Sequence, residues 1–252
     1  MQYPHTFFDS HLHIIDPAFP LMENNGYLPE PFLVRDYSES TKNYNLVGGA
    51  IVSGSFQAFD QAYLLAALKQ LGPSFVGVTQ LPATVSDADI ISLNSAGIRA
   101  VRFNLKRGGS ESLEKLSYFA SRVFELVGWH VELYVDAKEL DELYSTLVQL
   151  PKISIDHLGL SFAGFNSLLK LVEAGCHVKA TGFGRVDFDV SNGLKQIYKI
   201  NPDALMFGTD LPSTRAPRPF GHQDIELIDR TFSELEAARV FYKNALAFYA
   251  RN

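Results

Sequence analysis

The chain has 252 residues, a formal net charge of −6 and 46% hydrophobic residues. This length is sufficient for one large hydrophobic core, and the composition excludes a largely disordered protein. The acidic net charge and the lack of a basic run or a basic helix face argue against a nucleic-acid-binding surface.

Short apolar runs alternate with longer amphipathic stretches along the whole chain. The apolar runs predict eight strands, at residues 6–10, 49–53, 75–80, 98–104, 130–135, 152–156, 177–181 and 205–208. The amphipathic stretches predict helices at residues 59–71, 87–96, 111–127, 138–149, 165–174, 190–200, 224–232 and 234–249.

This alternation determines the expected fold class. Strands that alternate with helices pair in parallel through right-handed crossovers. Eight such units in a chain of this length favour an α/β protein with a single (β/α)₈ TIM-barrel domain over residues 1–252, rather than an open doubly wound sheet. The first strand is followed by the motif DSHLH (residues 9–13) instead of a glycine-rich phosphate-binding turn, which argues against a dinucleotide-binding fold. The longest irregular segments, residues 14–34 and 209–222, each follow a strand, so we expect them over the mouth of the barrel.

Cellular location is predicted from what the sequence lacks. Cys176 is the only cysteine, so no internal disulfide can form, and its apolar neighbours predict a buried, unreactive thiol. No secretory leader is visible, and no apolar run approaches the ~20 residues that span a bilayer. We therefore expect a cytoplasmic protein without a membrane partner. Monomer and homo-oligomer are both compatible with the sequence.

Polar residues are concentrated where the predicted strands end. His11 and His13 are two residues apart, so their side chains point to the same side of an extended segment. His157 follows the sixth strand, and Asp210 follows the eighth, which closure of the barrel places beside the first. Three imidazoles and one carboxylate at one mouth fit either a divalent-metal site or a hydrogen-bonding clamp on a substrate oxygen.

A second group of candidates is basic. Arg102 lies between apolar residues of the fourth strand, Arg107 lies in the loop after it, and Arg185 follows the seventh strand. Guanidinium groups around a partly buried pocket favour recognition of carboxylates or phosphates. Arg99, three residues before Arg102, should face differently, and Lys106 is compatible with a solvated surface charge.

Two further polar residues end strands and are candidates for substrate binding. Tyr134 ends the fifth strand and Ser53 the second, and either could donate a hydrogen bond to a substrate or only pack. The other four histidines are expected to be structural, because they precede the barrel, begin strands at its opposite end or begin a helix: His5, His130, His177 and His222.

The ordered set of these motifs resembles the amidohydrolase superfamily, in particular the branch that contains 2-pyrone-4,6-dicarboxylate lactonase and related sugar lactonases. The resemblance covers nearly the whole chain and rests on six segments, at residues 9–13, 101–104, 128–133, 155–159, 178–182 and 207–212.

The resemblance implies a role for each candidate. Asp210 would be the general base, and His11, His13 and His157 would surround the scissile carbonyl or, together with Asp210, one metal ion. The substrate would be held by four residues: Arg102, Arg107, Tyr134 and Arg185. The expected reaction is attack of water on the carbonyl of a small anionic lactone, with Asp210 taking a proton from the water and returning it to the leaving oxygen.

Two departures from the family pattern matter. Arg102 and Tyr134 stand where many members carry the lysine or glutamate and the histidine of a binuclear centre, so the expected cofactor is either none or one divalent metal such as zinc. Leu160 stands where the pyrone lactonases carry an arginine, so one carboxylate contact is missing, and Arg215 and Arg218 could replace it. The alternatives are a zinc sugar lactonase, a non-oxidative decarboxylase on the same barrel, and a catalytically silent binding barrel.

Overall fold

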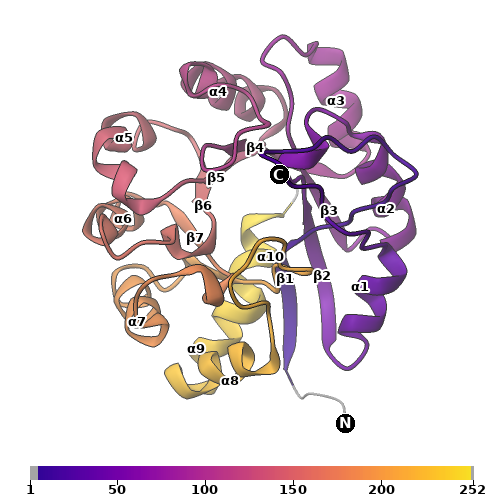
Figure 1. The fold of residues 1–252 in the computed structure, drawn as a ribbon. Coiled ribbons are helices and arrows are strands. Elements are labelled where there is room, and N and C mark those ends of the chain that lie inside the picture. The colour runs from indigo at the N-terminus through magenta and orange to yellow at the C-terminus, as the bar shows by residue number, and fades with distance from the viewer. Residues whose placement is uncertain (1–4, 251–252) are drawn as a thin grey trace.

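In the computed structural model, which describes residues 5–250, eight parallel strands alternate with helices around a nearly closed barrel (Figure 1). The predicted (β/α)₈ barrel is therefore confirmed. The strands are hydrogen-bonded in chain order: β1 (Thr6–Leu12), β2 (Asn45–Val52), β3 (Phe75–Thr79), β4 (Ile98–Asn104), β5 (His130–Tyr134), β6 (Ile153–Ile155), β7 (His177–Ala180) and β8 (Leu205–Phe207).

The helices surround the strands, as Figure 1 shows. Their bounds are α1 (Val34–Thr41), α2 (Ala62–Leu71), α3 (Asp87–Ser95), α4 (Leu116–Val127), α5 (Leu140–Leu147), α6 (Phe165–Glu173), α7 (Val190–Ile200), α8 (His222–Thr231), α9 (Glu234–Ala238) and α10 (Asn244–Phe248). Short helical turns precede or join them: η1 (Ser55–Gln57), η2 (Leu113–Lys115), η3 (Ala137–Glu139), η4 (His157–Gly159), η5 (Phe183–Arg185) and the π-turn η6 (Arg239–Lys243). Between residues 5 and 250, no helix combines the length and apolarity that crossing a membrane requires.

Apart from small shifts in the bounds of the other strands and helices, the structure differs from the predicted elements at three places. Helix α1 was not predicted, because its sequence VRDYSEST is mostly polar and buries only Tyr37 and Thr41. Strand β1 continues to Leu12, beyond the predicted end, so His11 lies within the strand. The predicted helix at residues 234–249 is divided into α9, η6 and α10.

The seam between β1 and β8 closes the barrel and joins two segments of the site. The Asp210 N–H donates to the carbonyl of His11 at 2.7 Å, and the His13 N–H donates to the carbonyl of Leu211 at 2.8 Å. The hydroxyl of Ser10 donates to the carbonyl of Met206 at 3.1 Å. The chain that leaves β8 is therefore held against the end of β1.

A buried carboxylate reinforces this seam. Asp9 Oδ1 accepts the Thr209 N–H at 2.7 Å, while Oδ2 accepts the Thr209 hydroxyl at 2.7 Å and the Tyr37 hydroxyl at 3.0 Å. Complete burial raises the pKa of Asp9 to about 6, although these hydrogen bonds oppose the shift. Asp9 therefore binds a proton more readily in the folded protein than in the unfolded chain. Because the fold disfavours the ionised form, the free energy of unfolding falls as the pH rises from the ordinary pKa of Asp9 through about 6.

Replacement of Tyr37 by phenylalanine should destabilise the protein in a pH-dependent manner. The lost hydrogen bond is worth about 2 kcal/mol when Asp9 is ionised and about 1 kcal/mol when it is neutral. We expect the larger loss in the free energy of unfolding at about pH 8 and the smaller at about pH 4.5, measured by urea denaturation. Tyr63→Phe is the matched control, because the buried Tyr63 hydroxyl bonds to the neutral hydroxyl of Ser53 at 2.7 Å. Equal pH dependence of the two variants would contradict this account of Asp9.

Helix α10 covers the end of the barrel opposite the mouth. Phe248 packs against His130 and His177, with ring centroids 4.2 and 4.3 Å apart, respectively. Both histidines are thus at the end of the barrel where the sequence placed them. Cys176 is buried as predicted, and its burial raises the pKa of its thiol.

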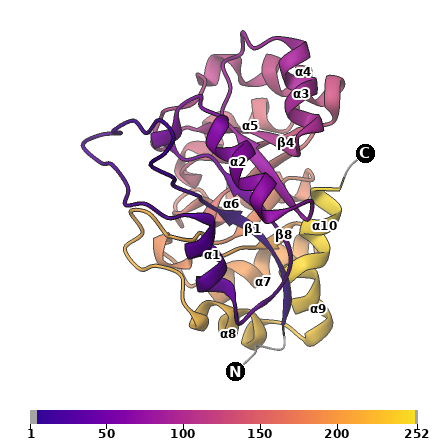
Figure 2. The same cartoon turned by 90° about the vertical axis from the view of Figure 1, so that its right-hand side faces the viewer.

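The two long connections that follow β1 and β8 lie on the same side of the molecule, opposite α10 (Figure 2). They also contact each other, because Arg215 Nη1 donates to Asn24 Oδ1 at 3.1 Å. As predicted, these segments lie at the mouth of the barrel.

Candidate active site

The structure brings the three imidazoles and the carboxylate predicted from the sequence to one point. Asp210 Oδ1 lies 3.7 Å from His13 Nε2, 3.8 Å from His157 Nε2 and 3.9 Å from His11 Nε2. All four side chains are buried. Residues separated by up to about 200 positions in sequence thus surround a single carboxylate oxygen.

The backbone at the strand ends turns two of these side chains into the barrel. His157 and Asp210 have positive φ angles, of 51° and 58°. This left-handed conformation costs a non-glycine residue about 1–2 kcal/mol, and such strain is common at functional sites. Gly182 makes room for the His157 ring, because a Cβ at residue 182 would lie 2.8 Å from His157 Nδ1.

The second ring nitrogen of each imidazole has its own partner. His13 Nδ1 lies 2.7 Å from the carbonyl of Val52, which can only accept, so the ring hydrogen of neutral His13 belongs on Nδ1. His157 Nδ1 is bonded to the hydroxyl of Thr181 at 2.8 Å. His11 Nδ1 lies 3.4 Å from Lys179 Nζ and 3.5 Å from Asp156 Oδ1. These partners fix how the rings are oriented.

Electrostatics keep the carboxylate ionised and two of the imidazoles neutral. Burial by itself raises the pKa of Asp210, but the Arg185 guanidinium and the neighbouring imidazoles hold it well below its usual value. Arg185 contacts Asp210 Oδ2 through Nε at 2.8 Å and Nη2 at 2.7 Å. Burial lowers the pKa of His157 to about 3 and that of His11 well below its usual value. At neutral pH the site therefore holds a carboxylate that can accept a proton.

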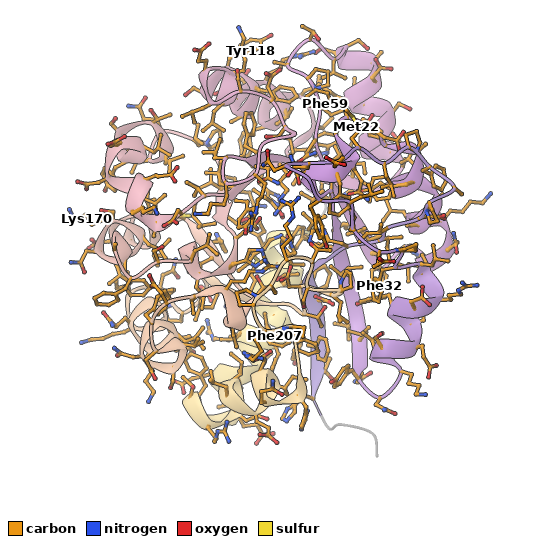
Figure 3. All side chains as sticks on the ribbon, viewed as in Figure 1. Met22, Phe32, Phe59, Tyr118, Lys170 and Phe207 are labelled. Carbon is orange, nitrogen blue, oxygen red and sulfur yellow. The ribbon has the colours of Figure 1, made fainter. Side chains whose placement is uncertain are left out.

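A pocket opens above Asp210, with about 380 Å³ of space between the surrounding atoms, part of which is open to solvent. Side-chain nitrogen atoms gather inside the ring of strands at the centre of the view in Figure 3. The lining is rich in arginine, tyrosine and other hydrogen-bond donors: His13, Tyr27, Gly54, Ser55, Phe56, Arg102, Asn104, Arg107, Tyr134, His157, Arg185, Asp210, Thr214 and Arg215. Such a lining suits a small anionic ligand.

The four arginines of this pocket differ in how their charge is compensated. Arg102 donates to Asp156 Oδ2 at 2.8 Å, and Arg185 pairs with Asp210. Arg215 stacks over the Tyr27 ring at 4.1 Å and bonds to Asn24, without a carboxylate partner. Arg107 also has no ion pair within the described part of the chain. Two half-buried cations at the mouth are therefore available to an anion.

Other residues singled out in the sequence lie away from the pocket. The hydroxyl of Ser53 faces Tyr63 of α2, and Ser53 does not line the pocket, whereas Ser55 does. Lys106 pairs with Asp136 at 2.8 Å, and Arg99 donates to the carbonyl of Asn94 at 2.7 Å. Arg218 pairs with Asp224 at 2.6 Å. Of the predicted substrate-binding residues, the pocket brings together Arg102, Arg107, Tyr134 and Arg185.

Comparison with known proteins places this fold and site in a family. The family model described as Amidohydrolase matches residues 8–251. The chain belongs to the amidohydrolase family. This agrees with the resemblance stated from the sequence.

Individual relatives resemble this amidohydrolase over different lengths. A 2-pyrone-4,6-dicarboxylate hydrolase of Comamonas testosteroni is 30% identical over 60% of this chain and 51% of the relative. A D-galactarolactone isomerase of Agrobacterium fabrum is 25% identical over 69% of this chain and 62% of the relative. The matched part thus spans between half and two thirds of these relatives. The crystal structure of a probable 2-pyrone-4,6-dicarboxylic acid hydrolase from Acinetobacter baumannii superimposes with a TM-score of 0.83, at 23% identity over 96% of this chain and 98% of that one, which shows a common fold.

Members of this family are typically metal-dependent, and the residues present fit one divalent ion. Ligand atoms of His11, His157 and Asp210 all lie within 4.8 Å of one another. Asp210 Oδ1 and His11 Nε2 are buried without a hydrogen-bond partner, so both are available to a ligand at this point. Imidazole nitrogens with one carboxylate oxygen are a donor set that suits zinc and related ions.

Sequence reasoning missed a layer of charged residues beneath the site. Glu132, Asp156 and Lys179 are fully buried and form ion pairs with one another or with Arg102. Glu132 and Lys179 each interrupt an otherwise apolar strand, which was the available indication. In a barrel such positions point inward, where a charged side chain needs a partner.

Proposed function

We propose that this protein hydrolyses a small lactone that carries carboxylate groups. One observation supports the proposal above all: an ionised Asp210 oxygen without a hydrogen-bond partner, ringed by three imidazoles, lies at the base of an arginine-lined pocket. A general base, donors for a developing oxyanion and cations for an anionic substrate are the groups that such a reaction requires. The name of the relative from Comamonas testosteroni points to the same class of substrate.

The proposed mechanism uses the side chains of this chain as follows. Asp210 Oδ1 takes a proton from a water molecule while the water oxygen forms a bond to the lactone carbonyl carbon. Ring N–H groups of His11 and His157 stabilise the negative charge on the carbonyl oxygen. The ring C–O bond then breaks, and the leaving oxygen takes the proton from Asp210. A divalent ion, when bound by His11, His157 and Asp210, would supply Lewis-acid polarisation of the carbonyl.

The mouth of the pocket determines the proposed substrate class. Leu160 does not line the pocket, whereas Arg215 and Arg107 do, and we assign to Arg215 the carboxylate contact that is missing at Leu160. Their uncompensated charges, together with Tyr27, Tyr134 and Ser55, favour a ligand with more than one carboxylate.

The test is turnover of a panel of lactones by purified protein, depleted of metal and then supplemented with zinc or manganese. The panel includes 2-pyrone-4,6-dicarboxylate, galactarolactones and uncharged lactones of the same ring size. We expect kcat/KM for the carboxylated lactones to be higher than for the uncharged ones by about 100-fold or more. An uncharged ligand would leave the cations of the pocket without a partner. A preference for uncharged lactones, or turnover of none, would refute the proposal.

Replacement of Arg215 by methionine should weaken substrate binding without a comparable loss of catalysis. The Arg215 guanidinium would contact a substrate carboxylate that does not react, so its effect is the same in the ground state and the transition state. We expect KM to rise about 10- to 100-fold and kcat to stay within about threefold. Arg218→Met is the matched control, because Arg218 pairs with Asp224 outside the pocket. Equal effects of the two substitutions on KM would contradict a role for Arg215 in binding.

A further inference from the structure

A lysine lies fully buried inside the barrel, directly beneath the candidate active site. Lys179 is on β7, between Val178 and Ala180, and its side chain is 0% exposed. Its Nζ donates to Glu132 Oε2, lies 3.4 Å from His11 Nδ1 and lies 3.8 Å from Asp156 Oδ1. Neither the resemblance nor the proposed mechanism assigns this lysine a role.

The surroundings of Lys179 are those of a charged ammonium group. Its Nζ has two hydrogen-bond acceptors, Glu132 Oε2 and His11 Nδ1, and forms an ion pair with Asp156. Glu132 Oε1 is held by His130 Nε2 at 3.1 Å and by the Tyr249 hydroxyl. Arg102 balances Asp156, so two cations and two carboxylates are paired in this layer. A buried lysine with these partners is neither free to move nor free to turn away from His11.

The contact between Lys179 and His11 bears on which ring nitrogen of His11 carries its hydrogen. A neutral imidazole has one N–H. An ammonium group can only donate, so Nδ1 must offer its lone pair to Lys179, and the hydrogen then belongs on Nε2. Asp156 Oδ1, 3.5 Å from the same Nδ1, would favour the opposite arrangement, but it makes no hydrogen bond to the ring, and its charge is already compensated by Arg102 and Lys179.

We propose that Lys179 is a positioning residue that holds His11 in the form with its hydrogen on Nε2. His11 then presents an N–H toward Asp210 Oδ1 and the reacting carbonyl oxygen. His13, whose Nδ1 hydrogen is taken by the carbonyl of Val52, presents a lone pair instead. His11 is thus a hydrogen-bond donor and His13 an acceptor, although the two are only two residues apart. Binding of an ion through His11 Nε2 would require this hydrogen to move to Nδ1, on the side of Asp156, so the proposed tautomer is that of the protein without a metal ion.

The tautomers can be measured without a substrate. A long-range proton–nitrogen correlation spectrum of the protein distinguishes an imidazole with hydrogen on Nε2 from one with hydrogen on Nδ1. His11→Asn and His13→Asn variants assign the two rings. We expect His11 to carry its hydrogen on Nε2 and His13 on Nδ1. A wild-type His11 with its hydrogen on Nδ1 would overturn the proposal, whether or not any variant folds.

Replacement of Lys179 tests the cause. In Lys179→Met the ammonium is lost, and we expect the His11 hydrogen to move to Nδ1, where Asp156 accepts it. Lys152→Met is the matched control, because Lys152 is a half-buried lysine at the opposite end of the barrel, bonded to the carbonyl of Phe248. An unchanged His11 tautomer in folded Lys179→Met would show that Lys179 does not set it.

The kinetic consequence rests on the proposed function. Loss of one donor to an oxyanion lowers kcat about 10²- to 10³-fold, so Lys179→Met should lose kcat by this factor with KM within about threefold, while Lys152→Met keeps both. Full activity in Lys179→Met would contradict the role in catalysis. Because the spectrum needs no turnover, a protein that hydrolyses no lactone but shows the expected tautomers would refute the proposed function and leave the role of Lys179 standing.

Discussion

Replacement of Asp210 by asparagine is expected to lower kcat about 10³-fold while the barrel still folds. Asparagine has nearly the same shape as aspartate but cannot accept a proton from water. The backbone contacts that position residue 210, including its N–H bond to the carbonyl of His11, do not depend on the carboxylate. The measurement is kcat and KM on the best lactone of the panel, together with circular dichroism to confirm folding.

The control for Asp210→Asn is Asp224→Asn. Both carboxylates pair with an arginine, but Asp224 lies with Arg218 at the start of α8, away from the pocket. We expect Asp224→Asn to keep kcat within about threefold of the wild type. If folded Asp210→Asn retains full activity, then Asp210 is not the general base.

Replacement of Arg102 by methionine is expected to cause the largest loss of stability, about 3–5 kcal/mol in the free energy of unfolding. Arg102 donates to Asp156 through Nε at 3.2 Å and Nη2 at 2.8 Å, and through Nη1 to the carbonyl of Ser53 at 2.7 Å. All three groups are buried. Without Arg102, the Asp156 charge would be left in a region of low dielectric with Lys179 as its remaining cation.

Two further variants define the origin of this loss. Arg122→Met removes an arginine that pairs with the exposed Asp87, and it should cost less than about 1 kcal/mol. The double variant Arg102→Met, Asp156→Asn should recover part of the stability, because it removes the uncompensated charge. Urea denaturation at neutral pH measures all of them. The charge argument fails if Asp156→Asn lowers the free energy of unfolding by as much in the Arg102→Met background as it does in the wild-type protein.

Several features of the site could be predicted because they depend on strand periodicity and order. His11 and His13 share a face since residues two apart on a strand point the same way. The proximity of Asp210 to both follows from closing eight consecutive strands into a ring. Arg107 and Arg185 line the pocket because they lie in loops that follow strands.

Other features depended on which way individual side chains turn. Arg215 and Arg218 are three residues apart in one loop, yet one lines the pocket and the other pairs with Asp224. Ser53 ends a strand as Tyr134 does, but its hydroxyl faces α2. Loop conformation and packing against helices determine these directions, and neither follows a repeating pattern in the sequence.

The sequence by itself determined the barrel, its mouth and the convergence of four polar residues there, because alternation of apolar and polar residues is a local property that sets strands, helices and their order. Only the tertiary structure revealed the layer of Glu132, Asp156 and Lys179, since partners for buried charges come from strands distant in sequence. The tertiary structure also placed both an ammonium group and a carboxylate near His11 Nδ1, at 3.4 and 3.5 Å, because Lys179 and Asp156 come from strands far from His11 in sequence.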